Sequence, residues 1–141
     1  MRRSGFSIHH VLLAAPPGSE GTARAFFVGV LGMREVAKPD RLARRGGIWL
    51  DLGMQQLHIG VDPKFRPAEK AHPAFEVEDL DALRARLERS GVPSWEDEPY
   101  PGRRRFYVRD PFGNRLEFLA SVTARRRRPA RPRSSPRAPH R

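Results

Sequence analysis

Four side chains that can bind a metal ion stand at spacings that recur along the chain. His58 and Glu117 are 59 residues apart, and His10 and His72 are 62 residues apart. Imidazole suits zinc, nickel and iron, and carboxylate suits harder ions. Two histidines with one carboxylate and open positions form the facial arrangement of non-haem iron enzymes. These residue types predict one site for a divalent metal ion such as Fe, Ni, Zn or Mn.

The spacing of 59 residues belongs to an internal repeat. It is shared by Gly32 and Gly91, Asp51 and Asp110, Leu57 and Leu116, and His58 and Glu117. Upstream of the expected helices the spacing becomes 62, because the loop at residues 16–18 makes the first copy three residues longer. A unit of this length that occurs only twice is not a solenoid repeat. We therefore expect an α+β fold of two pseudo-symmetric βαβββ modules, which form a cup-shaped sheet around one site.

Each copy has the hydrophobic pattern of one helix and four strands. The first helix is expected at residues 19–31 with Ser19 as its cap, and the second at residues 79–90 with Asp79 as its cap. Strands are expected at residues 6–14, 33–37, 47–51, 55–61, 71–77, 92–95, 105–109 and 115–119. Residues 62–70 are expected to form a linker and residues 110–114 a tight turn. A pseudo-two-fold axis would then bring equivalent strand positions around a common centre.

Four segments together resemble the vicinal-oxygen-chelate superfamily, which includes glyoxalases, bleomycin resistance proteins and extradiol dioxygenases. They are IHHVLLAAPP, FFVGVLGM, AHPAFEVEDLDALRARLERSGV and FYVRDPFGNRLEFL. The resemblance covers about residues 7–121, and its most specific part is the DP-x-GN turn followed by Glu117. It implies one domain at residues 6–122, with module one at about 6–62 and module two at about 71–121. It also implies a homodimer, since this fold often completes its cup across a subunit boundary.

The resemblance assigns roles to the four metal-binding candidates. In metal-using members the ligands fall on the first and last strands of each module, which implies His10, His58, His72 and Glu117. His10 is preferred to His9 because neighbouring residues of a strand face opposite sides. Glyoxalase I has a carboxylate, which can shuttle the substrate proton, where this chain has His58. His58 would have to serve as the base here, so we expect His58 and Glu117 to be the catalytic residues.

Two classes of function remain open. The first is a metal-dependent lyase, isomerase, transferase or dioxygenase whose ion chelates neighbouring oxygens of a small substrate and stabilises an enediolate or alkoxide. Fosfomycin-resistance enzymes and extradiol dioxygenases are similar through His10, His72 and Glu117. The alternative is a metal-free protein of the bleomycin-binding type, which sequesters an aromatic or cationic drug in the same cup.

Two further groups of residues have more than one interpretation. Arg103, Arg104 and Arg105 could hold an anionic substrate, or they could be an exposed run of charge in a loop. The aromatic residues Trp49, Trp95, Phe106 and Phe112 could line a substrate pocket, or they could belong to the core.

Composition restricts the setting of this chemistry. The 141 residues contain no cysteine, which excludes disulfides and thiol nucleophiles, and no apolar run long enough to span a membrane. Residues 1–122 hold 19 Lys and Arg against all 16 Asp and Glu, whereas the other eight arginines lie in residues 123–141. This Arg/Pro-rich tail is expected to be disordered and dispensable, and we expect no specific nucleic-acid partner. Without a recognisable signal peptide, the expected location is the cytoplasm.

Overall fold

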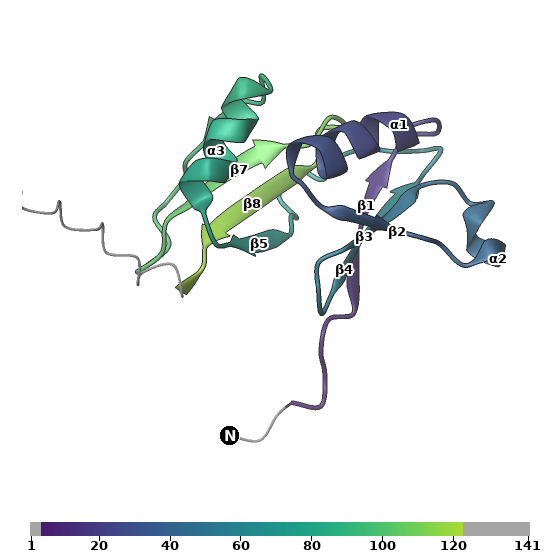
Figure 1. Cartoon of the computed structure of the whole chain (residues 1–141), viewed down its shortest axis with the longest axis horizontal. Coiled ribbons are helices and arrows are strands. Elements are labelled where there is room, and N and C mark those ends of the chain that lie inside the picture. The colour runs from purple at the N-terminus through teal and green to yellow at the C-terminus, as the bar shows by residue number, and fades with distance from the viewer. Residues whose placement is uncertain (1–3, 123–141) are drawn as a thin grey trace, which may run out of the picture.

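The computed structural model describes residues 4–122, which form two four-stranded sheets with a helix on one face of each (Figure 1). The first sheet has the strand order β1 (His10–Ala15), β4 (Gln56–Val61), β3 (Ile48–Asp51) and β2 (Arg34–Val36). The second has the order β5 (Ala74–Val77), β8 (Arg115–Ala120), β7 (Arg105–Arg109) and β6 (Ser94–Trp95). In both sheets the first two strands are parallel and the other neighbours are antiparallel. The predicted α+β fold of two βαβββ modules is confirmed, and the predicted tail lies outside the described residues.

One face of each sheet builds the hydrophobic core. Side chains alternate between the two faces of a strand, so every second residue points toward the helices. In the first sheet these residues are Ile48, Leu50, Leu57 and Ile59, and in the second they are Phe106, Val108, Leu116 and Phe118. All of them are buried with the apolar residues of the helices in one continuous cluster. The opposite face of each sheet is therefore left for other roles.

The second helix follows its sequence signals closely. α3 (Leu80–Arg89) begins after Asp79, whose side chain accepts a hydrogen bond of 2.9 Å from the backbone amide of Ala82. Leu80, Leu83 and Leu87 are buried in the core, as their spacing predicts. The helix ends before Gly91, which has the positive φ of 73° that favours glycine.

The first helix differs from its prediction in two ways. It starts as α1 (Glu20–Ala23) and continues as a π-helical segment, η1 (Arg24–Val30). In this wider turn Phe26 and Phe27 are both buried and contact each other edge-on, with ring centroids 5.0 Å apart. The predicted side-chain cap is wrong, because the buried hydroxyl of Ser19 makes no capping bond within the described residues.

Several strand boundaries also needed correction. Residues 6–9 precede β1 rather than belonging to it, and Phe6 is 91% exposed, because β1 pairs with β4 only from His10 onward. β5 and β6 are shorter than expected, since Pro73 and Pro93 lack the amide hydrogen that a strand ladder needs. A short helix, α2 (Asp40–Ala43), has no counterpart in the sequence analysis.

Strand register shows which positions of the two modules are equivalent. His58 pairs across its hairpin with Trp49, and Glu117 pairs with Tyr107, so the spacing of 59 holds on the last strands. One strand earlier the spacing is 58, because the second hairpin turn has five residues (110–114) and the first has four (52–55). The predicted equivalence of Asp51 with Asp110 is therefore wrong. Asp51 corresponds to Arg109, the last residue of β7.

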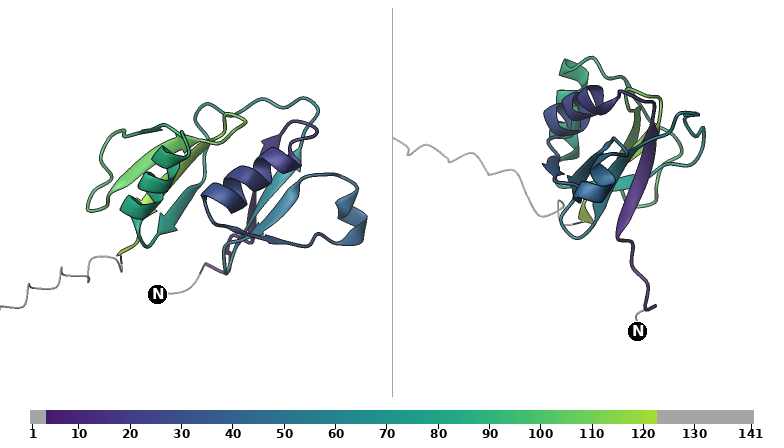
Figure 2. Two further views of the ribbon diagram at one scale, coloured as in Figure 1. Left: turned by 45° about the horizontal axis from the view of Figure 1, so that its top comes forward. Right: turned by 90° about the vertical axis from the view of Figure 1, so that its right-hand side faces the viewer.

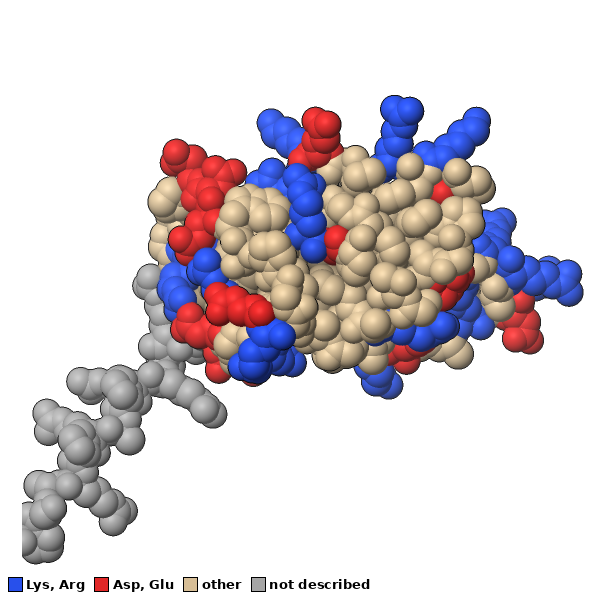
Figure 3. All heavy atoms as spheres, turned by 90° about the horizontal axis from the view of Figure 1, so that it is seen from above, with Lys and Arg blue, Asp and Glu red and all other residues tan. Residues whose placement is uncertain are grey.

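The two modules lie side by side, with their helices on the same side of the sheets (Figure 2). The turn at residues 110–114 joins them, because the amide Nδ2 of Asn114 donates to the backbone oxygen of Ala14 at 2.8 Å. Seen from the helix side, Lys and Arg share the rim with Asp and Glu around an uncharged centre (Figure 3). Among residues 4–122, none of the helices is long and apolar enough to cross a membrane.

Candidate metal centre

Two of the predicted ligands meet in module two, on the face opposite the helix. The Nε2 atom of His72 lies 2.9 Å from Oε2 of Glu117. His72 sits two residues before β5, and Glu117 is opposite Ala74 in the pairing of β5 with β8, so both side chains reach the same side. Glu117 is only 5% exposed. A carboxylate at this depth needs partners, and it has two.

The partners of this pair fix its geometry. The second oxygen of Glu117 accepts a bond of 3.0 Å from the guanidinium of Arg105, and Nδ1 of His72 lies 2.7 Å from the backbone oxygen of Lys70. A metal-binding histidine commonly donates its other ring nitrogen to a carbonyl, which orients the ring. Arg105 and the Lys70 carbonyl are therefore placed to orient such a ligand pair.

The separation of the two ligand atoms fits a shared metal ion. Atoms that bind one ion as neighbours, each at roughly 2.0–2.1 Å, lie about 3 Å apart. Nε2 of His72 and Oε2 of Glu117 are 2.9 Å apart. Nitrogen and oxygen donors of this kind suit Zn, Ni, Fe and Mn. These two residues could hold a divalent ion with little rearrangement.

The other two predicted ligands meet in module one, but in a different way. The ring of His58 is stacked between His10, at 4.2 Å between centroids, and Trp49, at 4.1 Å. Its Nε2 atom lies 2.9 Å from the side-chain oxygen of Gln56. Burial, followed by the charges of His10, His9 and Lys38, lowers the pKa of His58 to about 4. A neutral imidazole at neutral pH can accept a proton or bind a metal ion.

The structure thus brings the four predicted residues together as two pairs. His10 lies with His58 in module one, and His72 lies with Glu117 in module two. Within residues 4–122 of a single chain, no three His, Asp or Glu side chains gather where one ion could bind them. The four-residue site consequently stays a prediction.

The three arginines at residues 103–105 point in different directions and have different partners. Arg103 binds the backbone oxygen of Ala120, and Arg104 pairs with Asp81. Arg105, the first residue of β7, reaches Glu117. The sequence does not distinguish the three arginines from one another. Arg105 differs because it lies in β7, where side chains alternate between the two faces of the sheet and its own side chain lies on the face of Glu117.

The four aromatic candidates also divide between core and site. Phe106 is buried in the core, and Phe112 packs against it. Trp49 stacks on His58, and Trp95 stacks on Tyr107 at 5.7 Å between centroids, on the face that carries Glu117. Nothing in the sequence singles out Tyr107, although it is the cross-strand neighbour of Glu117 and only 2% exposed. Its position could be found only from the register of the hairpin.

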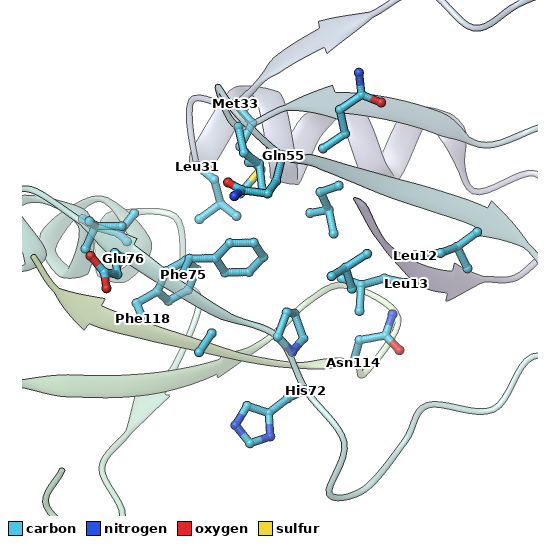
Figure 4. Close-up of a pocket in the computed structure, with 18 of the residues that line it drawn as sticks. Leu12, Leu13, Leu31, Met33, Gln55, His72, Phe75, Glu76, Asn114 and Phe118 are labelled. Atoms are coloured by element: carbon cyan, nitrogen blue, oxygen red, sulfur yellow. The ribbon is translucent and has the colours of Figure 1, made fainter. Parts of the chain in front are cut away.

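A groove of about 1270 Å³ lies between the two modules, and His72 is one of the residues that line it (Figure 4). Its walls are mostly apolar and include Leu13, Leu31, Met33, Phe75 and Phe118. It borders the module-two pair rather than enclosing it. A small apolar ligand could therefore lie beside the candidate metal centre.

Comparison with known proteins agrees with this architecture. Residues 7–118 match the Glyoxalase/Bleomycin resistance protein/Dioxygenase superfamily. A glyoxalase family protein from Bacillus anthracis is 47% identical, with a TM-score of 0.80 over 85% of this chain and 98% of that one. Lactoylglutathione lyase from Agrobacterium tumefaciens is 23% identical, with a TM-score of 0.64 over 84% of this chain and 96% of that one, and shares the fold.

A curated relative adds a sequence match over part of the chain. Glutathione transferase FosA from Serratia marcescens is 35% identical over 83 residues, which is 57% of this chain and 57% of that protein. The chain thus matches little more than half the length of this relative. The family assignment depends on the longer match, which covers both modules and includes His10, His58, His72 and Glu117. On that evidence, the chain belongs to the Glyoxalase/Bleomycin resistance protein/Dioxygenase superfamily.

Proposed function

We propose that this protein is a metal-dependent enzyme that acts on a small substrate with neighbouring oxygen atoms. The observation that carries the proposal is the pair formed by His72 and Glu117, whose donor atoms lie 2.9 Å apart. Arg105 and the backbone oxygen of Lys70 hold the two side chains in place. A buried carboxylate and imidazole oriented in this way form half of a metal site.

A second copy of the chain would supply the other half. His10 and His58 occupy the module-one positions that correspond to His72 and Glu117, yet they lie apart from them within one chain. β1 pairs with a strand on one side only, and Leu12 on that strand is 56% exposed. An edge strand with exposed apolar residues is a natural surface for association. We therefore propose a homodimer in which module one of each copy faces module two of the other.

The residues around the ion would have separate tasks. The bound ion would act as a Lewis acid toward the neighbouring oxygens of the substrate. His58 is neutral at pH 7, because its pKa lies near 4, and it would accept and return a substrate proton. Trp49 holds the His58 ring by stacking, and Gln56 fixes the direction of its Nε2 atom. Arg105 keeps the Glu117 carboxylate directed at the ion.

Metal analysis of the purified protein tests this proposal. The native protein should bind about one divalent ion per chain at micromolar concentration, and His72→Ala should lose it. Glu88→Ala is the control, because Glu88 is an exposed carboxylate on α3, on the other side of the sheet, and it should retain the ion. A native protein that takes up none of Fe, Ni, Zn or Mn would contradict the proposal.

One observation favours a second candidate function, a metal-free protein that binds aromatic drugs. Three rings, those of His10, His58 and Trp49, stack face to face as a column on the face of the first sheet that points away from the helices. A planar ligand would extend such a stack. Binding of a flat aromatic cation that persists without metal and is lost in Trp49→Ala would support this function over the first.

A further inference from the structure

We propose that Arg109 and Arg115, beside Trp95, form a subsite for an oxyanion of the substrate. This inference deepens the proposed function, on which it rests, by naming the substrate class for the same site. The ligand would be a small molecule that carries a carboxylate or phosphonate group in addition to its metal-chelating oxygens.

The two arginines stack on aromatic rings of the same sheet face, which is the first support for the subsite. The guanidinium carbon of Arg115 lies 4.2 Å from the ring centre of Tyr107 and 6.0 Å from that of Trp95. The guanidinium of Arg109 lies 5.5 Å from the Trp95 ring. An arginine stacked on an aromatic face keeps its planar edge free for hydrogen bonds and loses little freedom when it binds an anion. The two side chains are thus held in place before any ligand arrives.

The second support comes from the equivalent positions of module one. Arg109 and Arg115 pair across the second hairpin, and the corresponding residues of the first hairpin are Asp51 and Gln56. Both hairpins belong to the same kind of sheet, so the fold does not require positive charge at these positions. The arginines therefore have a role that module one does not share.

The third support is the balance of charge on this face. Arg105 is occupied by Glu117, whereas Arg109 donates to the uncharged backbone oxygen of Gly113. Arg115 has Asp97 at 3.5 Å, which is a long contact to a carboxylate that is about half exposed. Among the ion pairs of residues 4–122, these three guanidinium groups thus pair with two carboxylates, those of Glu117 and Asp97. One more negative charge would balance the arginines.

Two donors on this face have no partner. The Nε atoms of Arg105 and Arg115 are buried and make no hydrogen bond within residues 4–122. Buried donors of this kind are rare because each one is costly. A carboxylate or phosphonate could accept from both terminal nitrogens of one guanidinium at once, the two-point geometry for which arginine is suited.

The subsite lies close to the candidate metal centre. Arg115 and Glu117 are two residues apart on the same face of β8, which places their backbones about 7 Å apart. A single small substrate could therefore contact both places. The oxyanion would be separated from the chelating oxygens by a short spacer of a few atoms.

Calorimetric titration of the full chain with three probes tests the proposal. The probes are phenylphosphonate, benzoate and neutral benzyl alcohol, in 0.15 M NaCl. Metal is removed with a chelating resin, because a soluble polycarboxylate chelator would compete for the subsite. We expect saturable binding of at least one of the two anions and none of the alcohol, and the stronger anion identifies the preferred oxyanion.

The decisive variants are Arg109→Gln and Arg115→Gln, each expected to weaken anion binding tenfold or more. Arg115→Lys keeps the charge without the two-point geometry and should weaken binding severalfold. Arg104→Gln is the matched control, because Arg104 is exposed and pairs with Asp81, and it should change binding less than twofold. All variants keep residues 123–141, so binding of anions by those arginines cancels. Arg109 is exposed, so its variant tests the subsite even if Arg115→Gln fails to fold.

Several outcomes would overturn the inference. They are no saturable anion binding, equal binding of benzyl alcohol, or binding unchanged in both glutamine variants. Anions that bind only after metal is added, regardless of Arg109 and Arg115, would overturn the subsite but leave the proposed enzyme intact. Arginine-dependent binding by a protein that takes up no metal would support the subsite and contradict the metal-dependent function.

Discussion

Acidification of the metal-free protein should reveal the buried state of His58. The folded protein holds its pKa near 4, mainly through burial, whereas an unfolded histidine titrates near 6.5. Between these values the unfolded chain binds more protons than the folded one, so the free energy of unfolding must fall as the pH is lowered. Above about pH 7.5 the imidazole is almost wholly neutral in both states, and the effect vanishes.

The size of this effect follows from the two pKa values. Proton binding by His58 should lower the free energy of unfolding by about 2 kcal/mol when the pH falls from 7.5 to 5. Below pH 4 the total decrease should reach at most about 3.5 kcal/mol. Water that reaches the ring edge would reduce the first value to roughly 1–2 kcal/mol. A loss of this size is a large part of the stability of a small domain.

Urea unfolding followed by circular dichroism measures the effect. His58→Gln serves as the reference, because glutamine can still donate to Gln56 but does not titrate. The difference in unfolding free energy between the native protein and this variant should change by about 1–2 kcal/mol from pH 7.5 to pH 5, while other titrating groups cancel. Parallel pH profiles for the two proteins would refute the reasoning and place His58 in contact with water.

Three further predictions concern single substitutions. Asn114→Ala should lower the free energy of unfolding by about 1–3 kcal/mol, because a buried hydrogen bond between the modules is lost. In the same urea assay, alanine at the equivalent but exposed Gln55 should change this free energy by less than about 0.5 kcal/mol. Gly47→Ala should cost more than about 3 kcal/mol, since the new Cβ would lie 2.0 Å from a backbone oxygen of β4 at a φ of 80°, and a thermal midpoint within a few degrees of native would contradict this. Arg105→Gln should weaken metal binding roughly 10-fold or more in equilibrium dialysis, because Glu117 loses the hydrogen bond that orients its carboxylate. Arg104→Gln, at the exposed neighbouring position, should leave metal binding unchanged.

Much of the fold could be predicted because its signals are local. The spacing of Leu80, Leu83 and Leu87 and the cap at Asp79 specify α3 without reference to the rest of the chain. The errors occur where the structure depends on distant contacts. Residues 6–9 look like a strand by composition, but a strand also needs a partner, and β4 offers one only from Gln56 onward.

The equivalence of the candidate ligand positions could be predicted from the sequence, but their surroundings could not. The repeat predicts matching positions for His10 and His72 and for His58 and Glu117, and the register of the sheets confirms that correspondence. The neighbours of these residues depend on hairpin register, which one additional turn residue alters. For that reason nothing in the sequence distinguishes Tyr107, although it stands directly across from Glu117.

The two modules share a backbone plan but present opposite chemistry on their open faces. Module one offers stacked aromatic rings, with His58 between His10 and Trp49, and module two offers Arg105 and Glu117 with further arginines. In the proposed dimer, each cup would have one wall of each kind. An aromatic wall favours the apolar or planar side of a ligand, and a charged wall orients its oxyanion. In the proposed dimer, this asymmetry would place the chelating oxygens of a substrate between the two walls, where the two ligand pairs are proposed to meet.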